Sequence, residues 1–83
     1  MSYNKVYFVQ IQEKTARGLR RQFPTECFND YREARESLKF EVEAYGTHFG
    51  YDMQRDEQIE DLYSGYQDGV KMCELTIGGL IIH

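Results

Sequence analysis

The sequence contains few cysteines and no long apolar run. Its two cysteines, Cys27 and Cys73, are too few for the disulfide framework that stabilises small secreted domains. No apolar stretch approaches the roughly 18 residues that a membrane-spanning helix needs, and the N-terminus has neither an apolar signal segment nor a small-residue cleavage site. We therefore expect a soluble, cytoplasmic protein that does not bind membranes and that keeps both thiols buried and free.

Motifs that carry catalytic or metal chemistry are also lacking. The thiol and imidazole donors are Cys27, His48, Cys73 and His83, and no two of them have the close spacing that is usual in structural zinc sites. No local pattern joins a nucleophile to a base and an orienting group. Neither a phosphate-loop pattern nor a Gly-x-Gly-x-x-Gly pattern occurs. The sequence thus predicts no catalytic residue, no metal site and no cofactor, and we expect a protein that is not an enzyme.

Length and composition favour one small folded unit. The chain has 83 residues, of which 41% are hydrophobic and 14% aromatic, enough for one small core and too many for a disordered chain. A chain of this length falls near the lower end of the usual range for one domain. We therefore expect residues 1–83 to form a single α+β domain.

Charge is distributed unevenly along the chain. The net charge of −4 disfavours general binding to nucleic-acid phosphates. Residues 1–22 contain five basic side chains and one acidic side chain, whereas residues 23–83 contain five basic and thirteen acidic ones. Such asymmetry can direct a charged partner to one end of a protein or bring opposite ends of two copies together.

The N-terminal part of the chain has the pattern of a β-hairpin. Residues 5–12 are rich in β-branched and aromatic side chains, and the continuous apolar run at their centre is typical of a central strand covered on both faces. Residues 19–23 alternate weakly before Pro24, which lacks the N–H donor that an inner strand must supply. We expect residues 19–23 to form the edge strand of an antiparallel hairpin.

A helix is the clearest prediction. Asp30, followed three residues later by Glu33, has the side-chain chemistry of a helix N-terminus. Apolar positions then recur at spacings of three and four residues, as expected for one buried face, and Gly46 is expected to end the helix. The buried face comprises Tyr31, Ala34, Leu38, Val42 and Tyr45.

The remaining elements complete the expected fold. Residues 46–52 read as a loop whose aromatic rings cover one end of the core. Asp56 is expected to cap a second helix that buries Ile59, Leu62, Tyr63 and Tyr66, and residues 70–77 to form a strand with Cys73, Leu75 and Ile77 on one face. The order β-β-α-α-β predicts a three-stranded antiparallel or mixed sheet packed against two helices.

The first candidate site is an aromatic residue in acidic surroundings. Phe40 lies about 180° from the apolar face of the first predicted helix, so its ring should point away from the core. We expect it to anchor a protein partner, unless the second helix or another subunit covers it. The acidic side chains assigned to this protein-binding surface are Glu33, Glu36, Glu43, Asp56, Glu57, Glu60 and Asp61.

The alternative site is the basic segment before the helix. Arg17, Arg20 and Arg21 lie beside a glycine, and guanidinium groups can bind a phosphate or carboxylate through two hydrogen bonds. Aromatic residues of the hairpin could also stack on a nucleotide base. These aromatic residues are Tyr3, Tyr7, Phe8 and Phe23.

In length, acidity and aromatic content, the chain resembles the small proteins with which phages and mobile elements inhibit host defences, including CRISPR systems. That resemblance implies a non-enzymatic module that binds a host protein, such as one that itself binds nucleic acid, and occludes its surface. It assigns no individual residues. The alternatives are a nucleotide or anion binder that uses the arginine segment, and a homodimer that covers the C-terminal apolar tail or a sheet edge.

Overall fold

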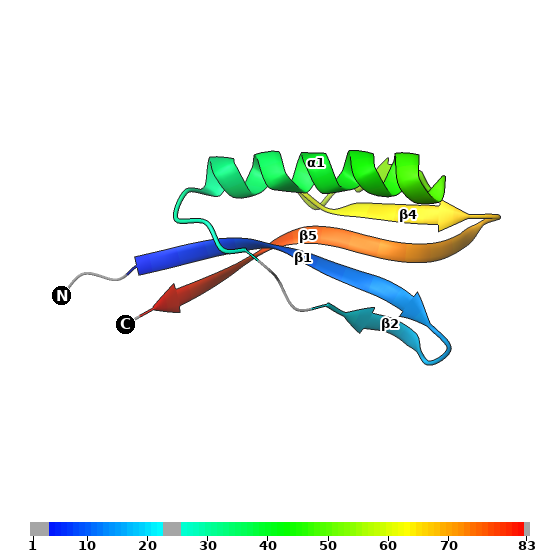
Figure 1. Cartoon of the computed structure of the whole chain (residues 1–83), viewed down its shortest axis with the longest axis horizontal. Coiled ribbons are helices and arrows are strands. Elements are labelled where there is room, and N and C mark those ends of the chain that lie inside the picture. Colours follow the sequence, from blue (N-terminus) through cyan, green and yellow to red (C-terminus); the bar gives the residue numbers. More distant parts are fainter. Residues whose placement is uncertain (1–3, 23–25, 83) are drawn as a thin grey trace.

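The protein is a five-stranded antiparallel sheet with one helix lying across one face (Figure 1). The computed structural model describes residues 4–22 and 26–82. The strand order is β2-β1-β5-β4-β3, and every neighbouring pair is antiparallel. The elements, in chain order, are β1 (Asn4–Thr15), β2 (Gly18–Arg21), α1 (Tyr31–Phe49), β3 (Asp52–Arg55), β4 (Tyr63–Gln67) and β5 (Val70–Ile82).

The predicted fold class is wrong, because the sheet has five strands rather than three and the described chain has one helix rather than two. The error lies in residues 52–67, where β3, a turn and β4 replace the second helix. Asp56 does accept backbone N–H groups, from Gln58 at 2.8 Å and Ile59 at 2.7 Å. The turn does not continue as a helix, since Asp61 adopts a left-handed conformation with φ of 58°.

The helix α1 forms where the sequence predicts it, although it ends three residues later than expected. Asp30 caps its N-terminus by accepting the backbone N–H of Arg32 at 2.9 Å. The helix continues through Gly46 and ends before Gly50, whose φ is 70°. Gly46 faces β3: a Cβ at this position would lie 3.4 Å from Met53 Cγ. Among the described residues, no helix has the length and apolar character needed to cross a bilayer.

The predicted hairpin is confirmed, and β1 is an inner strand as expected. The expectation that β1 is covered on both faces is wrong, because none of its residues is fully buried and the described chain has one helix. β1 pairs with β2 on one side and with β5 on the other, and β2 is an edge strand. Phe23 and Pro24, where the second strand was expected to end, lie outside the described residues. β5 continues past its predicted end and through Gly78 and Gly79 without leaving its ladder with β1. These two long strands form a ribbon that contributes to the protein's 50 Å length.

The core lies between α1 and the centre of the sheet, and it is small. Ala34 and Leu38 on α1 and Cys73 and Leu75 on β5 are fully buried, as predicted, whereas Tyr31, also predicted on the buried face of the helix, is 37% exposed. Burial raises the pKa of the Cys73 thiol. The expectation of two buried thiols is correct for Cys73 and wrong for Cys27, which is exposed. One helix over five strands therefore leaves the other face of the sheet without a second layer in the described chain.

Candidate functional site

Phe40 lies on the outer face of α1, opposite the residues that pack on the sheet. Its side chain is 70% exposed, the highest value among the large apolar residues described. Glu36 and Glu43 are placed one turn away on either side, four residues before and three residues after Phe40, and Glu33 lies one further turn back. The helix thus presents an aromatic ring flanked by carboxylates, in the arrangement that the helical spacing predicts.

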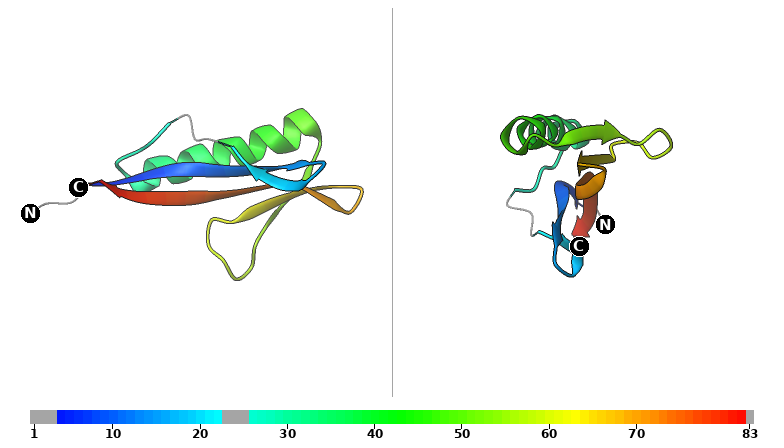
Figure 2. Two further views of the ribbon diagram at one scale, coloured as in Figure 1. Left: turned by 90° about the horizontal axis from the view of Figure 1, so that it is seen from below. Right: turned by 90° about the vertical axis from the view of Figure 1, so that its right-hand side faces the viewer.

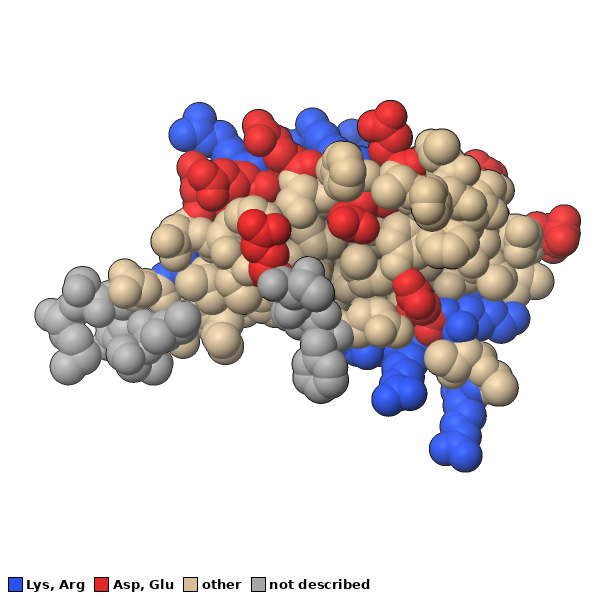
Figure 3. Space-filling model, viewed as in Figure 1, with Lys and Arg blue, Asp and Glu red and all other residues tan. Residues whose placement is uncertain are grey.

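The space-filling view shows how charge is distributed on this side of the protein. Acidic groups lie along the margin formed by α1, with basic groups between them, while a separate set of basic groups surrounds the β1–β2 hairpin (Figure 3). The basic groups on the helix include Arg32 and Lys39, both exposed. The uneven charge of the sequence therefore persists in the fold, with the most basic end at the hairpin.

The second group of predicted acidic residues belongs to the turn between β3 and β4. Glu57 and Glu60 are exposed, whereas Asp56 is occupied with capping the turn. The pKa of Asp56 is lowered by the backbone N–H groups of Ile59 and Gln58, which stabilise its carboxylate. The predicted carboxylates therefore do not form one group: Glu33, Glu36 and Glu43 belong to α1, whereas Asp56, Glu57, Glu60 and Asp61 belong to the turn.

Asp61 differs from the other predicted acidic residues because it is buried, with only 5% of its surface exposed. Its carboxylate accepts a hydrogen bond from the Tyr31 hydroxyl, and its Oδ1 lies 3.2 Å from Arg35 Nε. Tyr31 and Arg35 are one turn apart on α1. Asp61 therefore fastens the β3–β4 turn to the helix and does not face a partner. Helical spacing alone does not predict this role of Asp61.

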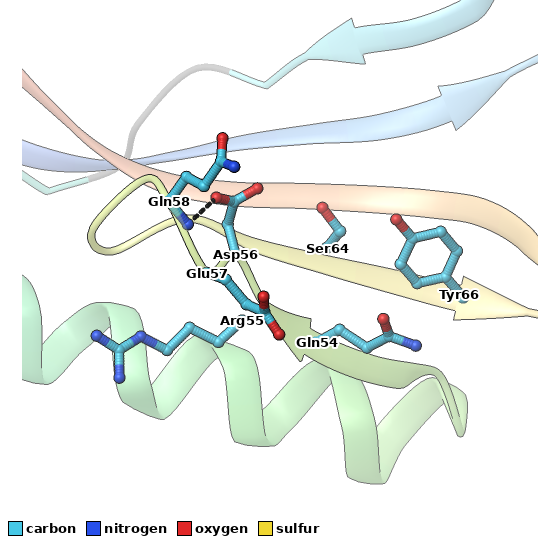
Figure 4. Close-up of a pocket in the computed structure, with 7 residues that line it drawn as sticks. All are labelled: Gln54, Arg55, Asp56, Glu57, Gln58, Ser64 and Tyr66. Carbon is cyan, nitrogen blue, oxygen red and sulfur yellow. Dashed lines mark hydrogen bonds between the residues drawn. The ribbon is translucent and has the colours of Figure 1, made fainter.

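A polar hollow of about 360 Å³ lies between this turn and the adjoining strands (Figure 4). Asp56 points toward the backbone of Gln58, while Ser64 and Tyr66 extend from β4 (Figure 4). The hollow offers amide, hydroxyl and carboxylate groups and has no apolar wall that would desolvate a reacting group. Its lining residues are Gln54, Arg55, Asp56, Glu57, Gln58, Ser64 and Tyr66. Among the described residues, no three His, Cys, Asp or Glu side chains converge in a way that could hold a metal ion.

The three arginines of the alternative site do come together. Arg17, Arg20 and Arg21 line one hollow of about 740 Å³ at the β1–β2 hairpin, and within the described residues none of them has an acidic side chain within 4.0 Å. The predicted stacking platform is not assembled there. Tyr7 packs against Tyr31 of α1 with ring centroids 5.5 Å apart, and Phe8 covers Gly78 on the opposite face.

Tyr3 and Phe23, the other aromatic residues expected near these arginines, lie outside the described residues, as does His83. Among the described residues, the hairpin hollow is lined by arginine and small or aliphatic side chains and not by aromatic rings. Its chemistry suits an anionic group more than a base.

The aromatic residues that follow the predicted helix form a cluster at its C-terminal end. Phe49 lies 5.2 Å from Tyr45 and 5.3 Å from Tyr51, measured between ring centroids. The Tyr45 hydroxyl donates a hydrogen bond to Glu13 on β1, and the pKa of Tyr45 is raised, first by burial and then by the Glu13 carboxylate. Tyr45 and Tyr51 pack against the core, as the sequence predicts, whereas Phe49 is half exposed and lies outside them.

Comparisons of the chain with protein-family models, with curated proteins and with solved structures found no match.

Proposed function

We propose that this protein is a non-enzymatic binding module that inhibits or regulates a host protein in the cytoplasm by occluding its surface with the outer face of α1. The observation that supports the proposal is Phe40. A phenylalanine that is 70% exposed in the middle of a regular helix contributes nothing to the protein's own core. Large aromatic residues are common as anchors at the centre of protein interfaces.

The residues around Phe40 indicate the chemistry of the partner. Glu36 and Glu43 flank the ring at one helical turn, so a matching surface would offer an apolar pocket with basic side chains at its rim. Charge complementarity of this kind mainly increases association rate and specificity, whereas the buried anchor supplies most of the affinity. Basic surfaces with apolar pockets are found on proteins that bind nucleic acid, and occupation of such a surface would block that activity.

Phe40→Ala tests the proposal. With a partner recovered by the wild-type chain and then purified, the substitution is expected to weaken binding by about 2 kcal/mol or more, roughly thirtyfold, because it removes the anchor. Affinity is measured by calorimetry, and circular dichroism confirms the fold.

Phe49→Ala is the matched control for this experiment. Phe49 lies nine residues further along α1, on the opposite side of the helix, and is 51% exposed. Its substitution should leave the affinity within a factor of about three, a change of less than 1 kcal/mol. Equal affinities for the wild type and Phe40→Ala would remove the helix face from the proposal.

A second candidate function is the binding of an anionic ligand at the hairpin, and the shared hollow of Arg17, Arg20 and Arg21 favours it. Millimolar ATP, cyclic nucleotides or inorganic phosphate should then raise the thermal midpoint, because a ligand that binds only the folded state stabilises it. The rise should disappear in Arg20→Ala/Arg21→Ala and persist in the control Arg32→Ala, which alters an exposed arginine on α1. Equal midpoints with and without these ligands would argue against this function.

A further inference from the structure

The strand β5 is longer than its neighbour β4, and this difference leaves part of the sheet without a neighbour. β4 pairs with β5 only as far as Leu75, whereas β1 pairs with β5 as far as Ile82. In the described chain, no strand lies beside residues 76–82 of β5 on the β4 side. Figure 2 shows this half of β5, coloured orange-red to red, running beside β1 with no strand on its other side. The unpaired edge of residues 76–82 is about 23 Å long at the usual rise of a strand.

The backbone groups that face this open side can be identified from the hydrogen bonds of β1. Tyr7 donates to Phe28 and accepts from Phe28 on the outer side of β1, each at 2.7 Å. In an antiparallel sheet, the N–H and C=O of one residue point to the same side, and the residue opposite points the other way. Gly79 is opposite Tyr7, so the N–H and C=O of Gly79 point away from β1, toward the open edge.

The direction of the backbone groups alternates along β5, so the residues two positions before and two positions after Gly79 point the same way as Gly79. Ile77 and Ile81, which are opposite Val9 and Lys5, also direct their backbone groups to the open edge. The edge therefore presents three N–H donors and three C=O acceptors, at Ile77, Gly79 and Ile81. Gly78 and Leu80 direct theirs toward β1.

This edge lacks the features with which proteins usually protect an unpaired strand. Residues 75–82 contain no charged residue and no proline, and the β1–β5 ladder has no irregularity there. Charges, prolines and bulges at an edge prevent pairing with another chain. Leu80 and Ile81 are moreover 58% and 52% exposed, although they lie within a regular strand. The segment has the properties of a strand that pairs with another.

We propose that residues 76–82 of β5 pair antiparallel with the same residues of a second copy, forming a symmetric dimer with Gly79 opposite Gly79 at the two-fold axis. In a dimer with two-fold symmetry, if one residue is opposite a second residue of the other copy, then that second residue is opposite the first one in return. With Gly79 at the centre, Ile77 of each copy is opposite Ile81 of the other. Because these three residues direct their backbone groups to the edge, this register satisfies all six groups of each strand.

The side chains agree with this register on both faces of the sheet. On the α1 face, Ile77 of one copy lies beside Ile81 of the other at two equivalent places, and such neighbouring pairs stabilise antiparallel strands. On the opposite face, Leu80 of the second copy is placed opposite Gly78. The space above Gly78 is filled by the Phe8 ring, which a Cβ at Gly78 would overlap. Leu80 would therefore be covered by an aromatic ring.

A second copy fits this edge because the two edges are identical in length and carry no charge. Residues 75–82 themselves carry no charge. The net charge of −4 opposes self-association in general, and Lys5 Nζ lies 3.9 Å from the position that a Cβ of Gly79 would occupy, so the register places one ammonium of each copy near the two-fold axis. Residues 76–82 of the second β5 occupy the side of the first β5 that β4 leaves without a neighbour. The β4 of that copy pairs with residues 70–75 of its own β5, and so lies beyond the end of the first strand.

Mass in solution tests the proposal. In reducing buffer, which excludes a disulfide through the exposed Cys27, the mass from sedimentation equilibrium should rise from 9.9 kDa toward twice that value as concentration increases from about 5 µM to 500 µM. Ile81→Lys, which adds a charge to the edge, should weaken self-association at least about tenfold. The control Val70→Lys alters a residue that is 43% exposed at the far end of β5 and should dimerise like the wild type.

Amide exchange measured by nuclear magnetic resonance tests the register. The N–H groups of Ile77, Gly79 and Ile81 should exchange at least about tenfold more slowly at high concentration, because dimerisation protects them. The N–H groups of Gly78 and Leu80, already bonded to β1, should not change. A mass of 9.9 kDa at every concentration would overturn the dimer. A dimer in which these three amides exchange equally fast at both concentrations would show that another surface forms it.

Discussion

Asp61→Ala is expected to reduce the free energy of unfolding by about 3 kcal/mol. The carboxylate of Asp61 is buried against α1, where it accepts the Tyr31 hydroxyl and lies 3.2 Å from Arg35 Nε. Alanine would remove a hydrogen bond to a charged acceptor, a contribution of about 1.5 to 3 kcal/mol. It would also leave the Tyr31 hydroxyl without its acceptor and the buried Arg35 Nε without its ion-pair partner.

The backbone conformation of Asp61 adds to the loss of stability in Asp61→Ala. Asp61 has a φ of 58°, and aspartate and asparagine tolerate the left-handed region better than alanine does. The conformational cost for alanine is about 1 kcal/mol. Asp61→Gly removes the same side chain without this cost, so Asp61→Gly should be about 1 kcal/mol more stable than Asp61→Ala. The difference between the two variants measures the conformational part alone.

Urea denaturation followed by circular dichroism provides the measurement, with Asp61→Asn as the matched variant. Asparagine keeps an oxygen that can accept the Tyr31 hydroxyl and tolerates the left-handed conformation, so it should lose less stability than Asp61→Ala. The control Glu60→Ala alters the exposed neighbour in the same turn and should change stability by less than about 0.5 kcal/mol. Equal stability for Asp61→Ala and Glu60→Ala would show that the turn is not fastened through this carboxylate.

The elements with a strong periodic pattern could be predicted from the sequence. The apolar face of α1 is correct because Ala34 and Leu38 recur at helical spacing and Asp30 caps the first turn. The predictions of β1, β2 and the start of β5 are also correct, because each of these segments is rich in strand-forming residues or has an alternating pattern. Gly46 misled the prediction of the helix end, because a glycine can also be selected by the close approach of another element, here Met53.

The second predicted helix shows where periodicity is insufficient. Ile59, Leu62, Tyr63 and Tyr66 are spaced by three, one and three residues, which fits a short helix as well as a turn followed by a strand. The tertiary structure decides between them. β4 has a neighbour on each side, β3 and β5, and Gly65 lets Cys73 and Met53 pack where a Cβ would collide with both sulfur atoms.

The position of Phe40 could be predicted from the sequence, whereas the position of Asp61 could not. Phe40 is exposed as the helical spacing requires, because α1 is regular throughout. Asp61 could not be placed, because its burial depends on a turn that brings it to Tyr31 and Arg35, thirty and twenty-six positions earlier in the chain. The three arginines lie at one hollow because the hairpin between β1 and β2 is short.

Leu38→Ala is expected to have the largest effect on stability, a loss of about 3 to 4 kcal/mol. Leu38 is fully buried, and Cys73 and Leu75 are the other large fully buried side chains described. For a chain of 83 residues, the total stability is expected to be about 4 to 12 kcal/mol. The substitution would therefore remove a quarter or more of the protein's total free energy of unfolding.

The arrangement of one helix over the sheet explains why the cavity left by Leu38→Ala would strongly reduce the free energy of unfolding. In the described chain one helix covers the sheet, so Leu38 has no second apolar layer behind it that could move inward and fill the space. The control Leu19→Ala makes the same chemical change on edge strand β2, where the side chain is 40% exposed, and should cost less than about 1 kcal/mol. Urea denaturation of the two variants should show a large difference in midpoint with similar slopes. Similar midpoints would mean that the contact between α1 and the sheet contributes little to stability, and that the long β1–β5 ribbon holds the fold together instead.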